Sequence, residues 1–334
     1  MTAPLRVGVV GVGHLGKHHA RIYASLPDVA LAGVVDTAPG RAEEIARERQ
    51  APAFTDHRAL FGKVDAVSVA VPTVGHFAIA KEFLERKIPV LVEKPLAKTI
   101  EEAEELVRIA RANGTALAVG HVERFNPAVI AARGKIAHPR FIEVHRLSPF
   151  RFRSTDIDVV MDLMIHDIDI ILHFVPSELK RVDAVGVSLL FGPEDIANAR
   201  FEFEDGCVAN VTASRVSDKQ MRKIRMFAPD AYISIDTLEK ASRVYRTTPQ
   251  LAEALARLPK DQELSLGDIA SIPREFYSIE EIHLPDEEPL ANELRSFVAC
   301  VREGREPEVP GEHGVRAMRT AERVLREMRE HVWR

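Results

Sequence analysis

The sequence predicts a two-domain α/β protein: an N-terminal doubly wound parallel sheet, followed by a C-terminal α+β domain with a large, mostly antiparallel sheet. Two observations favour this class. Apolar, β-rich runs alternate with helical stretches in the first part of the chain, and strand-like runs then follow one another with few helices between them. The 334 residues suffice for two ordinary domains, which we place at residues 1–123 and 124–334.

The first domain is predicted from a regular alternation of elements. Short apolar runs, typical of strands buried on both faces, predict strands at 5–10, 29–35, 65–71, 90–93 and 115–119. Helical stretches separate them at 15–26, 41–49, 76–86 and 100–112. Alternation of this kind specifies a parallel, doubly wound sheet.

The turn after the first strand carries the glycine motif G-V-G-H-L-G between a strand and a helix. Gly11 permits a tight turn, Gly13 lets the backbone approach a pyrophosphate, and Gly16 lets the helix pack closely on the strand. The helix N-terminus offers N–H donors and the positive end of its dipole to phosphates. A glycine turn of another α/β protein is the alternative, but the context favours a Rossmann dinucleotide site. Its predicted cofactor contacts are Gly11, Gly13, His14, Leu15 and Gly16.

The nucleotide preference is predicted from Asp36, at the end of the second strand. An acidic side chain there accepts hydrogen bonds from the adenosine ribose hydroxyls. It would repel the 2′-phosphate of NADP, so NAD is the expected cofactor and NADP is less favoured. Arg41 lies nearby and could serve a phosphate, although Pro39-Gly40-Arg41 also fits an ordinary helix start with a solvated arginine.

Two further strand ends carry residues suited to chemistry, because ligands of such sheets bind beyond the carboxyl ends of the strands. One strand continues into Pro72-Thr73 and His76, the other into Glu93-Lys94-Pro95. Pro95 biases Lys94 away from the helical region and holds it extended at the rim of the sheet. A lysine at a strand end is often a surface residue, but the expected nicotinamide nearby favours a catalytic role. We place all of these residues among the cofactor contacts.

The second domain is predicted from strand-like runs at 141–147, 181–190, 197–203, 207–215, 223–227 and 232–235. Glu204-Asp205-Gly206 is a hairpin turn signal. We expect long loops over 247–285 and two closing helices at 290–303 and 314–332. A broad sheet covered by helices on one face leaves its other face in need of a partner, which predicts a homodimer or homotetramer.

A polar stripe interrupts an otherwise apolar helix near residue 165. Asp162, His166 and Asp169 fall at i, i+4 and i+7, on one helical face. Buried carboxylates beside a histidine suggest a working site, since the histidine can exchange protons and an aspartate can orient its ring. The alternative is a core histidine with capping carboxylates. No second cluster at convincing metal-ligand spacing accompanies H-x-x-D, so no metal is expected.

Composition excludes several function classes. The net charge of −5 and the dispersed basic residues argue against a nucleic-acid-binding protein. No run approaches the roughly 20 continuous apolar residues of a membrane span, so no membrane association is expected. Cys207 and Cys300 alone allow neither a disulfide framework nor a cysteine-based zinc site. We therefore expect a cytoplasmic protein.

Taken together, these residues resemble the Gfo/Idh/MocA family of nicotinamide-dependent oxidoreductases over nearly the whole chain. Met164 departs from the family pattern, in which many members carry glycine between the aspartate and the histidine, and this bears on the pocket and the substrate. The shared markers are Gly11–Gly16, Asp36, Pro72-Thr73, His76, Glu93-Lys94-Pro95, Asp162, His166, Asp169, Asn292–Phe297, Pro307 and Val309-Pro310-Gly311.

The resemblance implies a dehydrogenase acting on CH–OH groups, which transfers a hydride between a sugar secondary alcohol and nicotinamide. Within the family, residues 121–127 and 161–169 look most like the nucleotide-sugar 3-dehydrogenase branch. Members of that branch oxidise UDP-N-acetylhexosamines such as UDP-N-acetylglucosamine at C3 to the 3-keto sugar. A free polyol or sugar dehydrogenase, such as one for myo-inositol, is the alternative, and a non-catalytic NAD-binding regulator is a further one.

The catalytic residues implied are Lys94, Asp162 and His166. His166 takes the hydroxyl proton, Asp162 orients it or relays charge, and Lys94 stabilises the developing alkoxide. The reverse assignment, with Lys94 as the base, stays open. Arg124 is a substrate candidate that could equally be a surface residue. The predicted substrate contacts are Lys94, Arg124, Asn126, His166 and Asp169.

Overall fold

The computed structural model describes residues 3–150, 157–190, 193–248, 250, 253, 277–282 and 286–331. It consists of two compact units. The first comprises Met1–Phe125 and Glu287–Glu322, and the second comprises Asn126–Asp286 and Arg323–Arg334. The boundary expected after residue 123 lies close to this division, but the return of the chain to the first unit was not predicted.

The first unit is built on a six-stranded parallel sheet with the order β3-β2-β1-β4-β5-β6. The order reverses beside β1, so a crevice for ligands opens at the carboxyl ends of β1 and β4. The predicted doubly wound sheet is confirmed, and β3 is an additional short strand. The strands are β1 (Leu5–Val10), β2 (Val29–Val35), β3 (Ala53–Phe54), β4 (Ala66–Val69), β5 (Val90–Glu93) and β6 (Leu117–Gly120).

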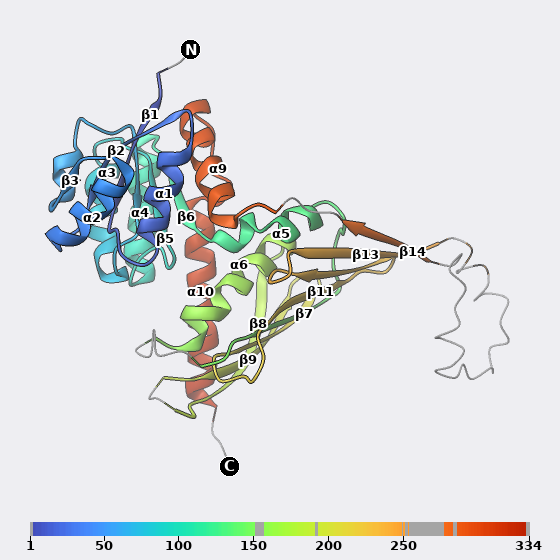
Figure 1. The fold of residues 1–334 in the computed structure, drawn as a ribbon. Coiled ribbons are helices and arrows are strands. Elements are labelled where there is room, and N and C mark those ends of the chain that lie inside the picture. Colours follow the sequence, from blue (N-terminus) through green and yellow to red (C-terminus); the bar gives the residue numbers. More distant parts are fainter. Residues whose placement is uncertain are drawn as a thin grey trace. The chain divides into compact units, whose positions relative to one another are not determined.

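Helices pack around this sheet (Figure 1). Helix α4 begins with a capping box, in which Thr99 accepts from the N–H of Glu102 and the Glu102 side chain accepts from the N–H of Thr99. The helices of the first unit are α1 (Gly16–Ser25), α2 (Pro39–Arg49), α3 (His76–Leu84), α4 (Ile100–Asn113) and α9 (Pro289–Glu303), with 3₁₀ turns η1 (His57–Leu60), η2 (Thr73–Gly75) and η3 (Val122–Phe125).

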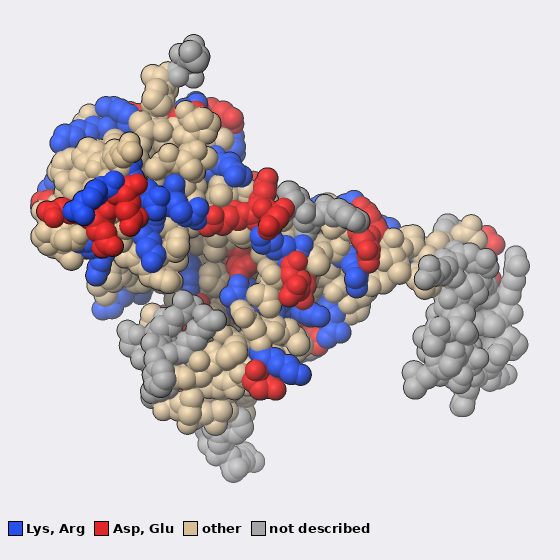
Figure 2. Space-filling view, viewed as in Figure 1, with Lys and Arg blue, Asp and Glu red and all other residues tan. Residues whose placement is uncertain are grey.

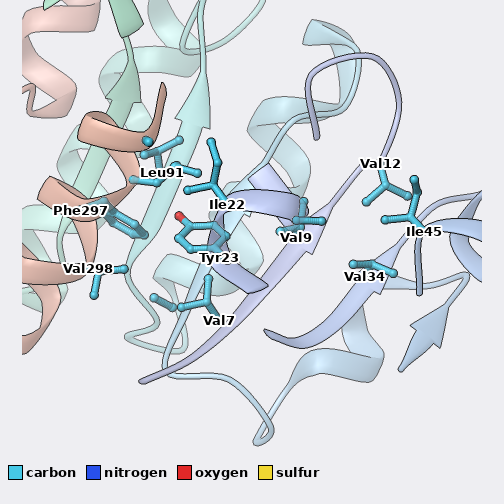
Figure 3. Close-up of a cluster of buried hydrophobic side chains, with 14 of the residues drawn as sticks. Val7, Val9, Val12, Ile22, Tyr23, Val34, Ile45, Leu91, Phe297 and Val298 are labelled. Atoms are coloured by element: carbon cyan, nitrogen blue, oxygen red, sulfur yellow. The ribbon is translucent and has the colours of Figure 1, made fainter. Parts of the chain in front are cut away.

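Helix α9 corrects the predicted domain limits, which placed it in the second domain. Its buried Phe297 and Val298 join the core cluster that contains Val7 and Tyr23 of the first sheet and α1 (Figure 3). The chain also pairs with β6, since Ala118 forms a β-bridge with Pro310. Residues 287–322 therefore complete the core of the first unit. An apolar helical stripe in a sequence predicts burial without indicating which core it joins.

The second unit contains an eight-stranded sheet with the order β14-β13-β12-β11-β7-β10-β9-β8. Among the strand pairs of this sheet in the described part of the chain, only β7–β10 is parallel, so the predicted mostly antiparallel sheet is confirmed. The strands are β7 (Phe141–Leu147), β8 (Leu179–Val187), β9 (Ile196–Phe203), β10 (Val208–Ser214), β11 (Met221–Phe227), β12 (Ala231–Asp236), β13 (Ala241–Thr247) and β14 (Tyr277–Ile282).

The predicted turn and loop signals of this unit have different outcomes. Glu204-Asp205-Gly206 does connect antiparallel β9 and β10, and Gly206 has a φ of +84° that favours glycine. The expected loop over 247–285 is wrong where β14 pairs with β13. Residues 249, 251–252, 254–276 and 283–285 of that prediction lie outside the described residues.

Short helices cover part of the second sheet. Helix α5 (Pro127–Ala132) packs on β12 and β13, while η4 (Val160–Met164) and α6 (Ile165–Phe174) pack on β10 and β7. The last helix, α10 (Gly311–Glu330), belongs to the first unit up to Glu322 and to the second from Arg323. Within the described part of the chain, no helix is both long and apolar enough to cross a membrane.

Acidic and basic side chains are interspersed on the face seen in Figure 2. Among the described residues, side chains of opposite charge also form ion pairs, for example Arg58 with Glu82 and Arg6 with Asp65, both with nitrogen–oxygen distances of 2.6 Å. Exposed pairs of this kind contribute little to stability. Because both signs of charge are mixed on the face in Figure 2, neither sign dominates it.

Candidate active site

The glycine loop between β1 and α1 tolerates no side chain at two of its positions. Gly11 has a φ of +85°, and a Cβ there would lie 2.8 Å from the carbonyl oxygen of Ala70. A Cβ on Gly16 would lie 1.7 Å from the carbonyl oxygen of Gly11, so α1 can start this close to the strand only with glycine. The roles expected for these two glycines, a tight turn and close helix packing, are confirmed.

Gly13 differs because a Cβ on it would meet nothing within 4 Å. The loop borders a cavity of about 560 Å³ at the carboxyl ends of β1, β2 and β4. The open space over Gly13 and the start of α1 fit a pyrophosphate that approaches the backbone. The predicted cofactor residues that line this cavity are Gly11, Gly13, His14, Leu15, Asp36 and Pro72.

We expect Gly13→Val to fold normally and to weaken NADH binding at least tenfold, or about 1.4 kcal/mol. The Cβ of the new side chain meets no protein atom within 4 Å, and the side chain enters the space over the loop. NADH fluorescence titration measures the affinity and thermal unfolding measures the stability. Gly40→Val, at an exposed position of α2 where a Cβ likewise meets nothing within 4 Å, is the matched control. Equal NADH affinity in the two variants would contradict the assignment.

Asp36 stands at the end of β2 and is 7% exposed. One carboxylate oxygen accepts the N–H of Val12, at 3.2 Å, and the other accepts that of Ala38, at 3.0 Å. These bonds fix a carboxylate on the cavity wall, as ribose recognition requires. The half-exposed Arg41 lies 3.4 Å from it and also lines the cavity. Arg41 is thus an ion-pair partner of Asp36 and not a fully solvated residue.

Apolar side chains complete the cavity wall. Leu15 is 45% exposed and Val74 is 74% exposed, although both are large aliphatic residues. Both line the cavity, together with Ile79 of α3. Aliphatic side chains left open to solvent beside a fixed carboxylate fit a ligand with a flat ring and a ribose.

The Glu93-Lys94-Pro95 segment leaves the carboxyl end of β5, with Glu93 buried and Lys94 half-buried. The carboxylate of Glu93 lies 2.9 Å from the Nε2 of His19 on α1. None of the three residues is part of the wall of the 560 Å³ cavity. Their role as cofactor contacts stays a prediction.

His76 is held between two main-chain carbonyls and does not line the cavity. Its Nδ1 lies 2.9 Å from the carbonyl oxygen of Pro95, and its Nε2 lies 2.9 Å from that of Val71. Burial lowers the pKa of His76, although both carbonyls and the charge of Glu93 act in the opposite direction. The ring thereby joins the ends of β4 and β5. Thr73, in the turn before α3, is also absent from the cavity wall.

In the second unit, the polar stripe begins in a π-helical segment instead of an uninterrupted α-helix. Asp162 lies in η4, whereas His166 and Asp169 lie in α6. Asp162 and His166 are half-buried and Asp169 is buried. π-Helical turns are rare and occur frequently at functional sites. No group of metal-ligating side chains is found among the residues that the structure describes.

Two buried ion pairs hold this helical segment on its sheet. Arg146 of β7 donates two hydrogen bonds to Asp167, of 2.7 and 2.8 Å, directly beside His166. Arg215 contacts Asp195 at 2.9 Å and donates to the carbonyl oxygen of Ile157 at 2.6 Å, where the chain enters η4. Sequence reasoning missed these positioning residues.

Two further predicted substrate residues, Arg124 and Asn126, are buried. Arg124, in η3, is 1% exposed, so the alternative of a solvated surface residue is wrong. Asn126 caps α5 by accepting the N–H of Ala128, and it donates to the carbonyl oxygen of Thr237 at 3.0 Å. These contacts give the Asn126 side chain a structural role.

Sequence comparison agrees with this geometry. The family model "Oxidoreductase family, NAD-binding Rossmann fold" matches residues 5–121, and the "GFO/IDH/MocA C-terminal domain" matches residues 128–233. UDP-N-acetylglucosamine 3-dehydrogenase of Acidithiobacillus ferrooxidans is 43% identical over 242 residues, which cover 72% of this chain and 77% of that protein. The scyllo-inositol 2-dehydrogenase (NAD(+)) of Bacillus subtilis is 30% identical over 236 residues, covering 65% and 69%.

Structural comparison extends the likeness to nearly the full chain. UDP-N-acetylglucosamine 3-dehydrogenase GnnA from Acidithiobacillus ferrooxidans superposes with a TM-score of 0.86 at 35% identity, covering 98% of this chain and 99% of that one. Scyllo-inositol dehydrogenase from Lactobacillus casei shares the fold, with a TM-score of 0.76 at 19% identity and coverage of 98% and 97%. The chain therefore belongs to the Gfo/Idh/MocA family of oxidoreductases and carries its NAD-binding Rossmann domain.

Proposed function

We propose that this NAD-dependent oxidoreductase oxidises a UDP-N-acetylhexosamine at C3 to the 3-keto sugar. The observation that carries the proposal is the likeness to UDP-N-acetylglucosamine 3-dehydrogenase, at 43% identity in sequence and a TM-score of 0.86 in structure. The names of the inositol dehydrogenases, at lower identity, favour a free polyol as the second candidate. The joint presence of Lys94, Asp162 and His166 argues against a non-catalytic NAD-binding regulator.

The cofactor, when bound, accepts a hydride from the carbinol carbon. Gly11, Gly13 and the start of α1 would hold its pyrophosphate, and Asp36 its adenosine ribose. The hydroxyl proton leaves for the imidazole of His166. Lys94 donates a hydrogen bond to the substrate oxygen and stabilises its developing negative charge.

Asp162 would orient His166 from the preceding helical turn, because η4 places it there. Asp169, which follows on α6, stays a predicted substrate contact, as does Arg124. The reverse assignment, in which Lys94 accepts the proton and His166 donates the hydrogen bond, also stays open. Their pH–rate profiles in single variants would separate the two assignments.

The substrate is tested by NADH formation with UDP-N-acetylglucosamine, UDP-N-acetylgalactosamine, UDP-glucose, myo-inositol and glucose, each with NAD and with NADP. Hydrazine traps the keto product and overcomes an unfavourable equilibrium. We expect turnover with the UDP-N-acetylhexosamines and NAD, and at least about tenfold lower kcat/KM with NADP because Asp36 repels the 2′-phosphate.

Turnover with myo-inositol and with none of the UDP-sugars would show instead that the protein is a polyol dehydrogenase. If the protein binds NADH but turns over none of these sugars, both candidate functions are overturned. Proton NMR of the product identifies the oxidised carbon, and a keto group at any carbon except C3 would contradict the proposed position.

Assembly and location are part of the proposal. Aromatic rings form a row across four neighbouring strands of the second sheet, with a tilted pair at a centroid separation of 5.8 Å and two stacked pairs at 4.8 and 5.1 Å. They are half-buried, and ring faces of this kind favour a protein partner. They support the predicted homodimer or homotetramer, while the cytoplasmic location rests on the cysteine content. The rings are Phe141, Phe227, Tyr232 and Tyr245.

A further inference from the structure

A buried histidine on α1 contacts the carboxylate that precedes Lys94. The His19 side chain is fully buried, and its Nε2 lies 2.9 Å from Oε1 of Glu93. The other carboxylate oxygen of Glu93 accepts the N–H of Lys94 itself, at 3.3 Å. One side chain thus connects the helix that follows the glycine loop with the backbone of Lys94.

The Glu93 carboxylate has little room to move. It packs on the end of β6, where a Cβ on Gly120 would lie 2.9 Å from its Oε2. A buried carboxylate is costly unless it is paired and hydrogen-bonded. Burial by itself raises the pKa of Glu93, but the bond to His19 and the charges of His19 and Lys94 outweigh it and leave the pKa below its usual value. Glu93 is therefore ionised at neutral pH.

Other titratable groups face the same carboxylate. Tyr23 of α1 and His76 of α3 both interact electrostatically with Glu93, and Glu293 of α9 acts on Tyr23. Burial raises the pKa of Tyr23, so it stays neutral at physiological pH. His76 holds the carbonyl oxygen of Pro95 on the other side of Lys94. Of these groups, His19 makes the hydrogen bond to the Glu93 side chain.

We propose that His19 is a positioning residue for Lys94, acting through Glu93. By keeping this carboxylate ionised and in place, His19 fixes the backbone from which the Lys94 ammonium extends. Because His19 lies on the helix that begins at the cofactor loop, the same helix orients both the cofactor and Lys94. This inference rests on the catalytic role of Lys94 proposed above.

The test compares His19→Leu, which removes the contact, with His19→Gln, whose amide nitrogen replaces the Nε2 donor. We expect His19→Leu to lower kcat at least about tenfold while the Kd for NADH, from fluorescence, changes less than about threefold. His19→Gln should recover most of the lost kcat. His18→Leu, at the adjacent half-exposed position outside the cofactor cavity wall, is the matched control and should leave kcat unchanged.

The pH profile separates positioning from packing. Without His19 only Lys94 still offsets the burial of Glu93, so the pKa of Glu93 rises and its charge is lost on the acid side. The acid limb of the kcat profile should therefore move to higher pH in His19→Leu. This movement should disappear when Glu93→Gln is combined with it. An unmoved acid limb, or equal kcat in the Leu and Gln variants, would overturn the proposal.

A readout that needs no substrate accompanies the kinetics. With the Glu93 pKa raised, the loss of thermal stability in His19→Leu should grow as the pH rises from about 5 to about 8, and Glu93→Gln should abolish this growth. A pH-independent loss contradicts the proposal even if the sugars tested are wrong. Normal turnover by Lys94→Met would contradict the catalytic role of Lys94. If Lys94→Met loses turnover while His19→Leu keeps the native kcat, only the positioning role of His19 is contradicted. If His19→Leu does not fold, His19→Gln and Glu93→Gln are compared by the same profiles.

Discussion

Lys94→Met is expected to abolish NADH production while leaving NADH binding intact. Methionine keeps the length and apolar stem of lysine but cannot donate a hydrogen bond or carry a charge. Groups that stabilise a developing alkoxide or move a proton typically contribute 10²–10⁴-fold to the rate. We therefore expect kcat to fall by at least about a thousandfold. The measurement is initial-rate kinetics with the best UDP-sugar, beside a fluorescence titration with NADH.

NADH binding should survive in this variant because Lys94 does not line the cavity at the glycine loop. Lys98→Met, at an exposed position shortly after the same strand, controls for loss of a lysine. It should retain the full rate. Residual turnover of Lys94→Met within about tenfold of the native protein would remove Lys94 from the chemistry.

Arg146→Met should produce the largest loss of stability, about 3–5 kcal/mol, because it leaves the charge of Asp167 buried without its two guanidinium bonds. Both side chains are almost fully buried, at 3% and 1% exposure. The pair connects β7 with the helix that carries His166, so this helix should lose its fixed position as well. Urea unfolding at neutral pH measures the free energy of unfolding.

Two controls make the origin of this loss visible. Combining Arg146→Met with Asp167→Leu removes the buried charge of Asp167 as well and should recover most of the stability. Arg225→Met removes a half-exposed ion pair with Glu143 in the same sheet, with a nitrogen–oxygen distance of 2.7 Å, and should cost less than about 1 kcal/mol. If Arg146→Met lowered the free energy of unfolding no more than Arg225→Met does, the expected large contribution of the buried pair to stability would be contradicted.

The parts of the fold that follow from local pattern could be predicted. The strands β1, β2 and β5 occupy the predicted ranges because continuous apolar runs mark strands buried on both faces. β3 has two residues, too few for any periodicity. β14, an edge strand with the sequence YSIEEI, carries charges where alternation would require apolar residues, so it was read as a loop.

The candidate site was predictable where the backbone itself imposes the residue. Gly11, Gly16 and Asp36 follow from strand–turn–helix geometry, and the structure places them as expected. His19 could not be found in this way, since its partner Glu93 is distant in sequence. The i+3 position after Gly16, on the buried face of the helix, is the signal that was available. The helix-capping role of Asn126 was not predicted, and its contact with the substrate stays a prediction, because a helix-capping amide and a substrate amide look alike in sequence.

The return of α9 to the first unit has a consequence for biosynthesis. A ribosome that has made residues 1–125 has not yet supplied Phe297, Val298 or the segment that bridges to Ala118. The nucleotide-binding core must therefore wait, with apolar surface uncovered, while the whole second sheet emerges. Contacts between such distant segments slow folding. The nascent chain is thus a natural client for chaperones that shield hydrophobic surface, and an expression fragment ending near residue 123 lacks part of its own core.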